Sequence, residues 1–515
     1  MFNILWLIAF AVAYGLFLQY LMHMFQLNSY KRDEQTAWMK RSPGRLAACC
    51  CIPLVMLILS LFKILPGPVA LLLWAAAILP AVRRQKAKKP LVYTARVNRM
   101  LVTHAIILVL ILILTGIFAG RWLLTAACAM YLLLPVLIFL VNTINAPVQK
   151  AVNRSYVNDA KRKLEDMKKS GLTVVGITGS YGKTSVKFFL TDLLSGKYNV
   201  LCTPKNYNTD LGVTKTIRED LNATHQIFVC EMGARRVRDI QDICDIVHPE
   251  YGIITSIGPQ HLETFGSIDN IIATKFELYN SIPDDGTVFL NYDNEYIRNY
   301  HGDRNQKGFG RDAGADFRLE SLEMSSSGSR FTVSIEGETA EFTTDLIGEY
   351  NILDILAAIS AAYTLGVSVK ELVRRVKKLR PVEHRLQLLP KTGRVSIIDD
   401  AYNSNPNGFR GAVDTISFFD AVKVLVTPGM IELGEKEYEL NYEAGRHAAE
   451  VCDYIILVGR NQTKPLQDAV RASETFDSSH LHVVDRLEQM WPIVNSIPGD
   501  RDIIVLLEND LPDNY

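Results

Sequence analysis

The chain has 515 residues, with 55 Lys and Arg against 55 Asp and Glu, so its formal net charge is zero. A neutral chain without basic stretches interleaved with aromatics excludes a nucleic-acid-binding role. Eight cysteines in so long a chain exclude a disulfide scaffold. The sequence contains no C-x-x-C pair, so it gives no sign of a zinc or redox site built on such a pair. The mean hydropathy of +0.10 is high for a soluble enzyme, which indicates one unusually apolar segment.

That apolar segment is residues 1–145, which predict a transmembrane helical domain of about five spans. The apolar runs lie at residues 1–26, 46–63, 64–82, 100–119 and 122–142. A full span needs roughly 20 residues. The run at 64–82 is short and opens on two prolines, so it either crosses fully or forms one arm of a re-entrant hairpin. A cleaved signal peptide is disfavoured, because the first run has no basic leader and no A-x-A site.

The loops between these runs predict the orientation of the protein. Lys and Arg stay on the cytoplasmic side during insertion, and two loops, residues 27–45 and 83–99, are basic. Their basic residues are Lys31, Arg32, Lys40, Arg41, Arg45, Arg83, Arg84, Lys86, Lys88, Lys89, Arg96 and Arg99. Five spans with the N-terminus outside place both loops inside, whether 64–82 crosses or returns with its neighbour. We therefore predict a multi-pass protein of the cell membrane with cytoplasmic catalytic domains.

The rest of the chain predicts two α/β domains, at residues 146–380 and 381–515. In the first, the β-branched runs LTVVGI, NVLCT, QIFVCEM, YGIITSI and TVFLNY alternate with helical stretches, which favours a mostly parallel sheet. Residues 316–346 alternate instead and predict an antiparallel hairpin, followed by a helix at about 351–364. In the second domain, RVSIID, KVLVTP, YIILVG and IIVLLE predict a further set of strands.

The strongest local motif is VVGITGSYGKTSVKFFL at residues 174–190, in which a strand, a glycine loop and a helix follow one another. Such a loop offers backbone N–H groups, an ammonium for phosphate and a hydroxyl for magnesium, which are the groups that hold a triphosphate. The residues predicted to bind the nucleotide are Thr178, Gly179, Ser180, Tyr181, Gly182, Lys183, Thr184 and Ser185. Ile177 replaces the usual first glycine of the phosphate-binding motif, so a plain glycine turn is the competing interpretation.

Three further polar residues follow in the same domain. Glu231 comes after the apolar strand QIFVC, so its carboxylate emerges at the carboxyl edge of the sheet, where such folds bind ligands. We predict that it contacts magnesium. Taken singly, His261 and Lys275 are interpreted as a loop histidine and a paired helix lysine.

Together these motifs resemble the Mur ligase family. The runs TGSYGKT, EMGA and GPQHLETFGS, with Lys275 behind them, are similar to the central ATPase domain of those enzymes. The motifs GEYNILDILAA, EHRLQ, DDAYNSNP, GMIELGE and AGRHAAE continue the match in order, over roughly residues 170–460. The motif sequences are most similar to those of the branch that adds D-alanyl-D-alanine. The resemblance implies a P-loop central domain, a Rossmann-like C-terminal domain, and an ATP-dependent ligase that forms amide bonds through an acyl phosphate in peptidoglycan precursor synthesis or modification.

The resemblance also implies cofactors and a role for each residue of the metal centre. ATP and Mg²⁺ would be held by Lys183 and Thr184, with Glu231 on the same metal. His261 would hold a second magnesium. Lys275 would be carbamylated by carbon dioxide, which turns a cation into a carboxylate-like group. Lys183, His261, Lys275 and Arg385 are the predicted catalytic residues.

Nucleotide and substrate contacts follow from the same resemblance. Asn351 would contact adenine, Arg385 would reach the γ-phosphate from the linker, and Asp400 would hold the ribose. Asn405 we interpret instead as a helix N-cap ahead of Pro406. The loop at residues 203–213 would face the acyl substrate, and its predicted contacts are Thr203, Asn206, Asn208 and Thr209.

Three departures from the family pattern leave the substrates open. Membrane spans stand where the family has a module that grips a uridine nucleotide, so the carboxylate substrate is either a small molecule or a lipid-linked precursor, and the second fits an anchor at the bilayer. Asp354 replaces the second asparagine of the adenine motif. The tail IIVLLENDLPDNY lacks the lysine-glycine-serine ending that is expected to recognise the amine, an amino acid or dipeptide.

Competing functions also remain open. A ligase that extends polyglutamate or tailors a lipid-linked wall intermediate would share every nucleotide residue. A relative that passes the acyl phosphate to ammonia is disfavoured, because its cysteine cluster is missing. From another class, the chain could be a catalytically inactive membrane regulator that binds nucleotide.

Overall fold

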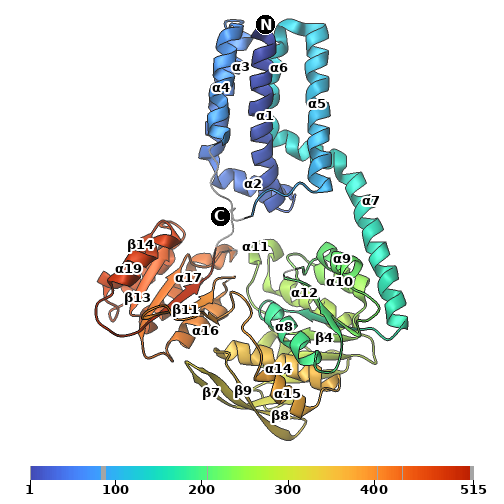
Figure 1. Cartoon of the computed structure of the whole chain (residues 1–515), viewed down its shortest axis with the longest axis vertical. Coiled ribbons are helices and arrows are strands. Elements are labelled where there is room, and N and C mark those ends of the chain that lie inside the picture. Colours follow the sequence, from blue (N-terminus) through green and yellow to red (C-terminus); the bar gives the residue numbers. More distant parts are fainter. Residues whose placement is uncertain (1, 83–88, 206, 403, 432, 511–515) are drawn as a thin grey trace. The chain divides into compact units, whose positions relative to one another are not determined.

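The structure, a computed structural model (Figure 1), describes residues 2–82, 89–205, 207–402, 404–431 and 433–510. The predicted basic residues Arg83, Arg84, Lys86 and Lys88 lie outside these ranges. The described chain forms two compact units, one before Ser155 and one at Ser155–Asp510.

The first unit is helical. Its helices are α1 (Phe2–Leu27), α2 (Arg32–Arg41), α3 (Pro43–Leu61), α4 (Gly67–Val82), α5 (Ala95–Ala119), α6 (Leu123–Leu132) and the first part of α7 (Leu134–Lys169). Buried aromatic rings join them: Phe10 meets Trp74 at 5.0 Å and Phe17 stacks on Tyr131 at 5.1 Å between ring centroids. Large apolar side chains also face outward, and Phe118 is 81% exposed. Such a surface is unfavourable in water and acceptable in lipid.

Three segments of this unit are long and apolar enough to cross a membrane: Ile4–Leu27, Pro43–Leu61 and Ala95–Leu132. Helix α4 has 16 residues, which at 1.5 Å per residue is about 24 Å, less than the roughly 30 Å of a hydrocarbon core. The fifth apolar run, 122–142, is divided between α6 and α7, and a 3₁₀ turn at Gly120–Trp122 joins α6 to α5. Within the described residues, three helical segments are thus both long and apolar enough to span, where the sequence predicted about five spans.

The second unit begins with a nine-stranded sheet in the order β2-β3-β1-β4-β5-β6-β7-β8-β9. Its strands are β1 (Thr173–Thr178), β2 (Val200–Cys202), β3 (Ile227–Glu231), β4 (Tyr251–Ile254), β5 (Thr287–Asn291), β6 (Gln306–Gly310), β7 (Phe317–Ser325), β8 (Gly328–Ile335) and β9 (Glu338–Thr344). Strands β1 to β7 pair in parallel, and β7, β8 and β9 pair antiparallel. The predicted parallel strands and hairpin are confirmed.

Helices cover both faces of this sheet. They are α8 (Lys183–Leu194), α9 (Asp210–Glu219), α10 (Asp239–Val247), α11 (Leu262–Phe265), α12 (Ile268–Ser281), α13 (Glu295–Arg298), α14 (Glu349–Thr364) and α15 (Val369–Val376). Because neighbouring strand residues point to opposite faces, Val175 packs in the core with α8 and α14, whereas Val174 packs with α10 and α12. The sheet is thus buried on both faces, as parallel sheets are.

A six-stranded sheet follows, in the order β10-β11-β15-β12-β13-β14. Its strands are β10 (Gln387–Leu388), β11 (Val395–Asp400), β12 (Val422–Thr427), β13 (Tyr454–Val458), β14 (Leu481–Val484) and β15 (Ile503–Glu508). Helices α16 (Pro406–Ile416), α17 (Glu437–Val451) and α18 (Lys464–Ala472) share one core, and α19 (Met490–Ser496) lies in the other. Asn405 caps α16 by accepting the Gly408 N–H at 2.8 Å, with Pro406 first in the helix, as predicted.

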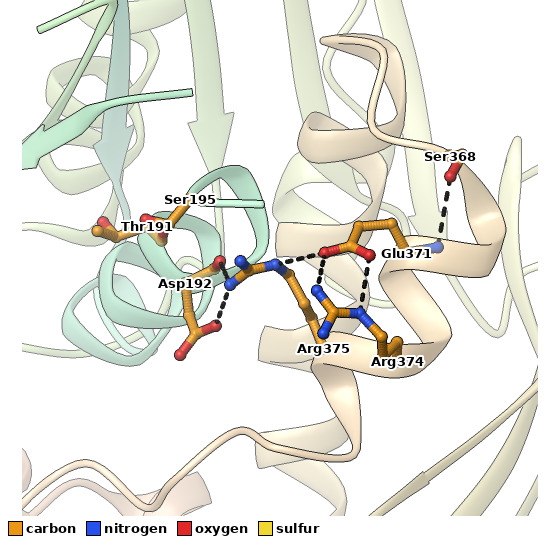
Figure 2. A network of polar contacts seen from close by, with 7 residues as sticks. All are labelled: Thr191, Asp192, Ser195, Ser368, Glu371, Arg374 and Arg375. Atoms are coloured by element: carbon orange, nitrogen blue, oxygen red, sulfur yellow. Dashed lines mark hydrogen bonds and ion pairs between the residues drawn. The ribbon is translucent and has the colours of Figure 1, made fainter. Parts of the chain in front are cut away.

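A surface ion-pair network joins α15 to the end of α8 (Figure 2). Arg375 donates to the Asp192 carbonyl at 2.7 Å and to its carboxylate at 3.0 Å, near the C-terminal end of α8. Glu371 accepts from both Arg374 and Arg375. A cation at a helix C-terminus is favourable, so this network holds α15 against the helix that begins at the phosphate loop.

This network predicts a pH-dependent stability difference for Glu371→Gln. The hydrogen bond from Arg374, with that from Arg375, lowers the pKa of Glu371 from 4.5 to about 2. A lowered carboxyl pKa contributes stability above the unfolded value and loses it as the pH falls toward the folded value. We expect a small loss in the urea midpoint at pH 7 that shrinks below pH 4.5. An equal difference at pH 7 and at about pH 2 would contradict this assignment.

Candidate active site

The glycine loop after β1 has the close packing that a phosphate site needs. Gly179 and Gly182 have φ angles of +151° and +80°, in the region that favours glycine. A Cβ at Gly179 would lie 2.1 Å from Thr255 Oγ1, and one at Gly182 would lie 2.3 Å from Asp354 Oδ1. Helix α8 then starts at Lys183, so its unpaired N–H groups and positive dipole end face the loop.

The segment after β4 supports this loop from the side. Ser180 N–H donates to the Ser256 carbonyl at 2.6 Å, and Tyr181 N–H donates to Ser256 Oγ at 3.2 Å. The Tyr181 hydroxyl reaches the Pro259 carbonyl at 3.1 Å. These two N–H groups, predicted to be available to phosphate, are instead bonded within the protein. The N–H groups left for phosphate are those of Gly182 and the first turn of α8.

Lys183 lies folded over the loop. Its Nζ donates to the carbonyls of Gly179 at 2.6 Å and Ser180 at 2.9 Å. Burial lowers the pKa of Lys183 to about 8, while Glu231 opposes that shift. A phosphate beside the ammonium would favour its charged form, so this lysine is suited to bind a nucleotide.

Glu231, at the end of β3, is the centre of a buried polar cluster. Its Oε1 accepts from Thr184 Oγ1 at 3.1 Å and from Asn208 Nδ2 at 3.0 Å. Its Oε2 lies 3.0 Å from Lys187 Nζ, and both side chains are almost fully buried, at 1% and 0% exposure. The predicted magnesium pair, Thr184 and Glu231, is therefore brought together.

Lys187 was missed by sequence reasoning. Its Nζ also donates to the Lys205 carbonyl at 2.5 Å, so it connects Glu231 to the loop that was assigned to the acyl substrate. The available signal was its position one turn after Lys183 in the otherwise apolar run SVKFFL. A lysine in such a run needs a buried anion as partner.

The oxygen atoms of Thr184 and Glu231 suit magnesium. Mg²⁺ prefers oxygen ligands and is usually bound by one or two carboxylates together with phosphates and waters. Among the described residues Glu231 Oε2 accepts no hydrogen bond, but the Lys187 ammonium lies 3.0 Å away, so magnesium would have to share this carboxylate with Lys187. Within the described ranges, no group of three or more His, Cys, Asp or Glu side chains is arranged for a metal.

His261 lies at the end of the supporting segment. It adopts a left-handed backbone conformation, with φ 54°, directly before the short helix α11, and its carbonyl accepts from Phe265 N–H at 3.0 Å. Its position follows the Pro259 carbonyl that holds Tyr181. A second metal site containing His261 is not preassembled in the part of the chain that the structure describes.

Lys275 is buried on α12 with 1% exposure. Among the described residues its ammonium makes no hydrogen bond and no ion pair. Burial lowers its pKa well below the ordinary value, and the charge of Lys183 acts in the same direction. The predicted ion-paired lysine is thus absent, and the environment favours a neutral amine.

The predicted adenine and ribose contacts already have partners within the protein. Asn351 donates to the Ile347 carbonyl at 2.8 Å. Asp400 accepts from Tyr350 OH at 3.1 Å and from Leu386 N–H at 3.0 Å. A bound nucleoside would have to share or replace these hydrogen bonds. The contact between Tyr350 and Asp400 also links α14 to the second sheet.

Asp354 and Arg385 lie near the phosphate loop. The carboxylate of Asp354 packs against Gly182, although the sequence placed it in the adenine motif. Burial raises the pKa of Asp354 well above its usual value, while Arg385, Ser185 and Lys183 oppose the shift. Arg385 stacks 4.4 Å over the Tyr402 ring. The linker arginine is therefore positioned to act electrostatically on the groups around Lys183.

The loop assigned to the acyl substrate is tied to the metal carboxylate. Thr203 Oγ1 accepts the Glu231 N–H at 3.1 Å, and Asn208 donates to the Glu231 side chain. Thr209 caps α9 by accepting the Gly212 N–H at 3.2 Å. Asn206 lies outside the described residues. The three described residues thus hold the loop in shape in this structure.

Comparison with known families decides the relationship. The Mur ligase middle domain matches residues 177–362, and the Mur ligase glutamate ligase domain matches residues 384–507. The chain belongs to the Mur ligase family. Members of this family are ATP-dependent ligases that form amide bonds and use Mg²⁺. Residues before 177 fall outside both matches.

Three similar proteins relate this Mur ligase to the MurF ligases. It is 28% identical over 337 residues to the UDP-N-acetylmuramoyl-tripeptide–D-alanyl-D-alanine ligase of Haemophilus influenzae, covering 64% of this chain and 72% of that one. MurF from Acinetobacter baumannii superposes with a TM-score of 0.63 at 26% identity, over 70% of this chain and 77% of that one. MurF from Thermotoga maritima, whose structure was solved with ADP, superposes with a TM-score of 0.62 at 26% identity. The match covers 70% of this chain and 80% of that one.

The buried pair predicts the effect of Lys187→Met. The substitution keeps an unbranched side chain but leaves Glu231 without its cation, and losing a partner of a metal-ligand side chain typically costs 10–100-fold in metal affinity. We expect the Mg²⁺ concentration needed for ADP binding to rise by roughly that factor. Lys197→Met is the matched control, because Lys197 donates to the Gly366 carbonyl and lies over the Tyr198 ring, with no ion pair to a described carboxylate. Equal Mg²⁺ requirements in the two variants would exclude a role for Lys187.

Proposed function

We propose that this Mur ligase is a membrane-anchored enzyme that uses ATP to join a carboxylate to an amine in cell-wall precursor synthesis or modification. The observation that carries the proposal is that Thr184 donates to Glu231, that Glu231 acts electrostatically on Lys183, and that buried Lys275 is affected by the charge of Lys183, all at the carboxyl edge of β1 and β3. We assign ATP binding to the domain of the nine-stranded sheet and closure over the nucleotide to that of the six-stranded sheet.

The first step would transfer the γ-phosphoryl group of ATP to the carboxylate. A carboxylate oxygen forms a bond to phosphorus, the bond to the bridging oxygen of ADP breaks, and ADP leaves. Thr184 and Glu231 would hold magnesium, which when bound offsets the charge on the phosphates. Lys183 and Arg385 would face the transferring group as fixed cations. Their charges are in place before the reaction, which is what makes such groups effective.

The second step would form the amide. The amine nitrogen attacks the acyl carbon, the bond from that carbon to the phosphate oxygen breaks, and phosphate leaves with a proton from the amine. Water would compete with the amine, so closure of the second domain onto the nucleotide would protect the acyl phosphate. The hydrogen bond between Tyr350 and Asp400 would connect the two domains during this step.

Lys275 would carry a carbamate. Burial lowers the pKa of this amine, which makes no hydrogen bond or ion pair to the described residues, and the neutral form of an amine adds to carbon dioxide with loss of one proton. The resulting anion would place negative oxygen atoms near Lys183 and would supply a further oxygen ligand for the magnesium that Thr184 and Glu231 would hold. His261 would provide the second metal contact from the neighbouring loop.

The substrates are proposed from the family. The Haemophilus influenzae relative is named for a UDP-N-acetylmuramoyl-tripeptide and for D-alanyl-D-alanine. We propose a related carboxylate here, carried on a lipid because three apolar helical segments before residue 145 are long enough to cross a membrane, and an amino acid or dipeptide as the amine. A polyglutamate-type ligase remains the alternative enzyme, and the loop at residues 203–213 would face either acyl substrate.

The decisive test is product analysis. Full-length protein in detergent or nanodiscs is incubated with ATP, membrane lipid precursors, the soluble UDP-linked tripeptide and a pool of amino acids and dipeptides, and products are identified by mass spectrometry. We expect amine-dependent ADP release and an amide on a lipid-linked carboxylate. Nucleotide binding without amine-stimulated turnover would support the inactive regulator instead. Equal use of the soluble tripeptide would contradict the lipid-linked assignment.

Lys183→Ala should abolish most turnover. The variant loses the ammonium that faces the transferring phosphoryl group, which is expected to cost on the order of a hundredfold or more. The readout is the rate of amine-dependent ADP release at saturating ATP. Retained activity would show that the loop does not bind the reacting phosphates.

Lys275 predicts a chemical rescue. In Lys275→Ala, a short-chain carboxylate can occupy the space of the carbamate, so acetate or formate should restore part of the lost activity. Lys275→Arg keeps a cation and fills the cavity, so it should stay inactive under the same conditions. If neither variant responds to carboxylates, the lysine acts without a carbamate.

A further inference from the structure

The helical unit is strongly basic although the whole chain is neutral. Residues 1–154 contain 16 Lys and Arg but only two acidic residues, Asp33 and Glu34. Glu34 is paired with Lys31 at 2.9 Å. The remaining cations of this unit therefore far outnumber its own carboxylates. Such an excess beside apolar helices favours anionic ligands of the membrane.

Two of these arginines flank a ridge of three aromatic rings, Phe25, Tyr30 and Phe139. The ring of Phe25 lies 5.6 Å from that of Tyr30 and 5.7 Å from that of Phe139, edge to face in both cases. Arg96 stacks 3.8 Å over Tyr30, and Arg32 lies 5.7 Å over Phe139. Arg32 is the first residue of α2 and Arg96 the second residue of α5, and each guanidinium group lies over a ring of this ridge.

A third arginine adds to the same end of α5. Arg99 follows Arg96 by three residues, so the two share a face of the helix. Arg96 donates to Asn142 Oδ1 at 3.0 Å, and Arg99 donates to Gln149 Oε1, both on α7. Arg99 Nε is buried and has no hydrogen-bond partner among the described residues.

These three arginines retain most of their binding capacity. A guanidinium carries five N–H donors, and Arg96 and Arg99 each make one side-chain hydrogen bond to the described protein. Arg32, Arg96 and Arg99 form no ion pair with any carboxylate that the structure describes. We call these three residues the arginine cluster. Their charges are oriented by rings and amide oxygens, and no carboxylate within the described residues is paired with them.

We propose that the arginine cluster binds the diphosphate headgroup of a lipid. The planar donor fork of arginine matches phosphate oxygens in a bidentate manner, and three fixed cations suit two linked phosphates better than the single charge of a phosphodiester. The cluster lies at the ends of membrane-type helices on the predicted cytoplasmic side, where basic pockets bind polyanionic headgroups. A lipid is therefore the source that fits this position.

The inference rests on the proposed function, because it gives the lipid-linked substrate a place to bind. The UDP-linked substrate named for the relative carries its sugar on a diphosphate. A lipid diphosphate would present the same group from the bilayer. The helical unit, which precedes the two family matches at residues 177–362 and 384–507, would then supply the substrate-gripping role.

The test compares the affinity for a polyprenyl diphosphate of the wild type, a cluster variant and a control variant. Each is the full-length protein in phosphatidylcholine nanodiscs. The variant is Arg96→Gln with Arg99→Gln. Its matched control is Lys63→Gln with Arg121→Gln, which removes two cations that lie 5.8 Å and 5.9 Å over the Trp122 ring, at the other ends of α3 and α5. Binding is measured by native mass spectrometry, with retained ADP binding as the check that each variant is folded.

We expect the Arg96 and Arg99 variant to lose at least about tenfold in affinity for the polyprenyl diphosphate, because several charge-assisted hydrogen bonds are removed, while the control keeps wild-type affinity. Phosphatidylglycerol in place of the diphosphate, and soluble inorganic pyrophosphate, should both bind more weakly than the lipid diphosphate. Unchanged binding in the variant, or equal binding of either comparison ligand, would overturn the proposal. The binding measurement needs no turnover, so its result does not depend on whether the protein shows ligase activity.

Discussion

The ion pair between Lys187 and Glu231 is the contact on which the geometry of the site depends. A buried carboxylate without a partner is strongly unfavourable, and here the cation that compensates it comes from the same helix that begins the phosphate site. Thr184 on that helix and Asn208 on the neighbouring loop share the other oxygen. One carboxylate thus fixes the phosphate helix, the end of β3 and the substrate loop in a single arrangement, before any nucleotide binds.

The sheet order explains why these groups meet. Strand β1 lies between β3 and β4, so the glycine loop, Glu231 and the segment after Thr255 all emerge at neighbouring carboxyl ends. The chain leaves β1 toward β2 on one side and later returns to β4 on the other, which is the kind of switch point where open α/β sheets bind ligands. The arrangement of the site is therefore a consequence of topology as much as of individual residues.

Much of this could be predicted from the sequence, for identifiable reasons. Strands β1 to β5 and the hairpin were visible because β-branched runs and strict alternation are strong local signals. Strand β6 was missed because its sequence QKGFG has two glycines and no β-branched residue. The partners of Glu231 were not predictable, since Lys187 and Asn208 reach it only after distant segments pack together. The hydrogen bonds that occupy Asp400 likewise depend on Tyr350 from another domain.

The account depends most directly on Glu231 and Thr184 as the magnesium-binding pair of a nucleotide site. Calorimetric titration of the full-length protein with ADP, in the presence and absence of Mg²⁺, tests this without knowledge of the substrates. In the wild type, Mg²⁺ should tighten ADP binding, and in Glu231→Gln that effect should disappear while metal-free ADP binding persists. If Mg²⁺ strengthens ADP binding equally in both proteins, the carboxylate is not a metal ligand and the proposed centre is wrong.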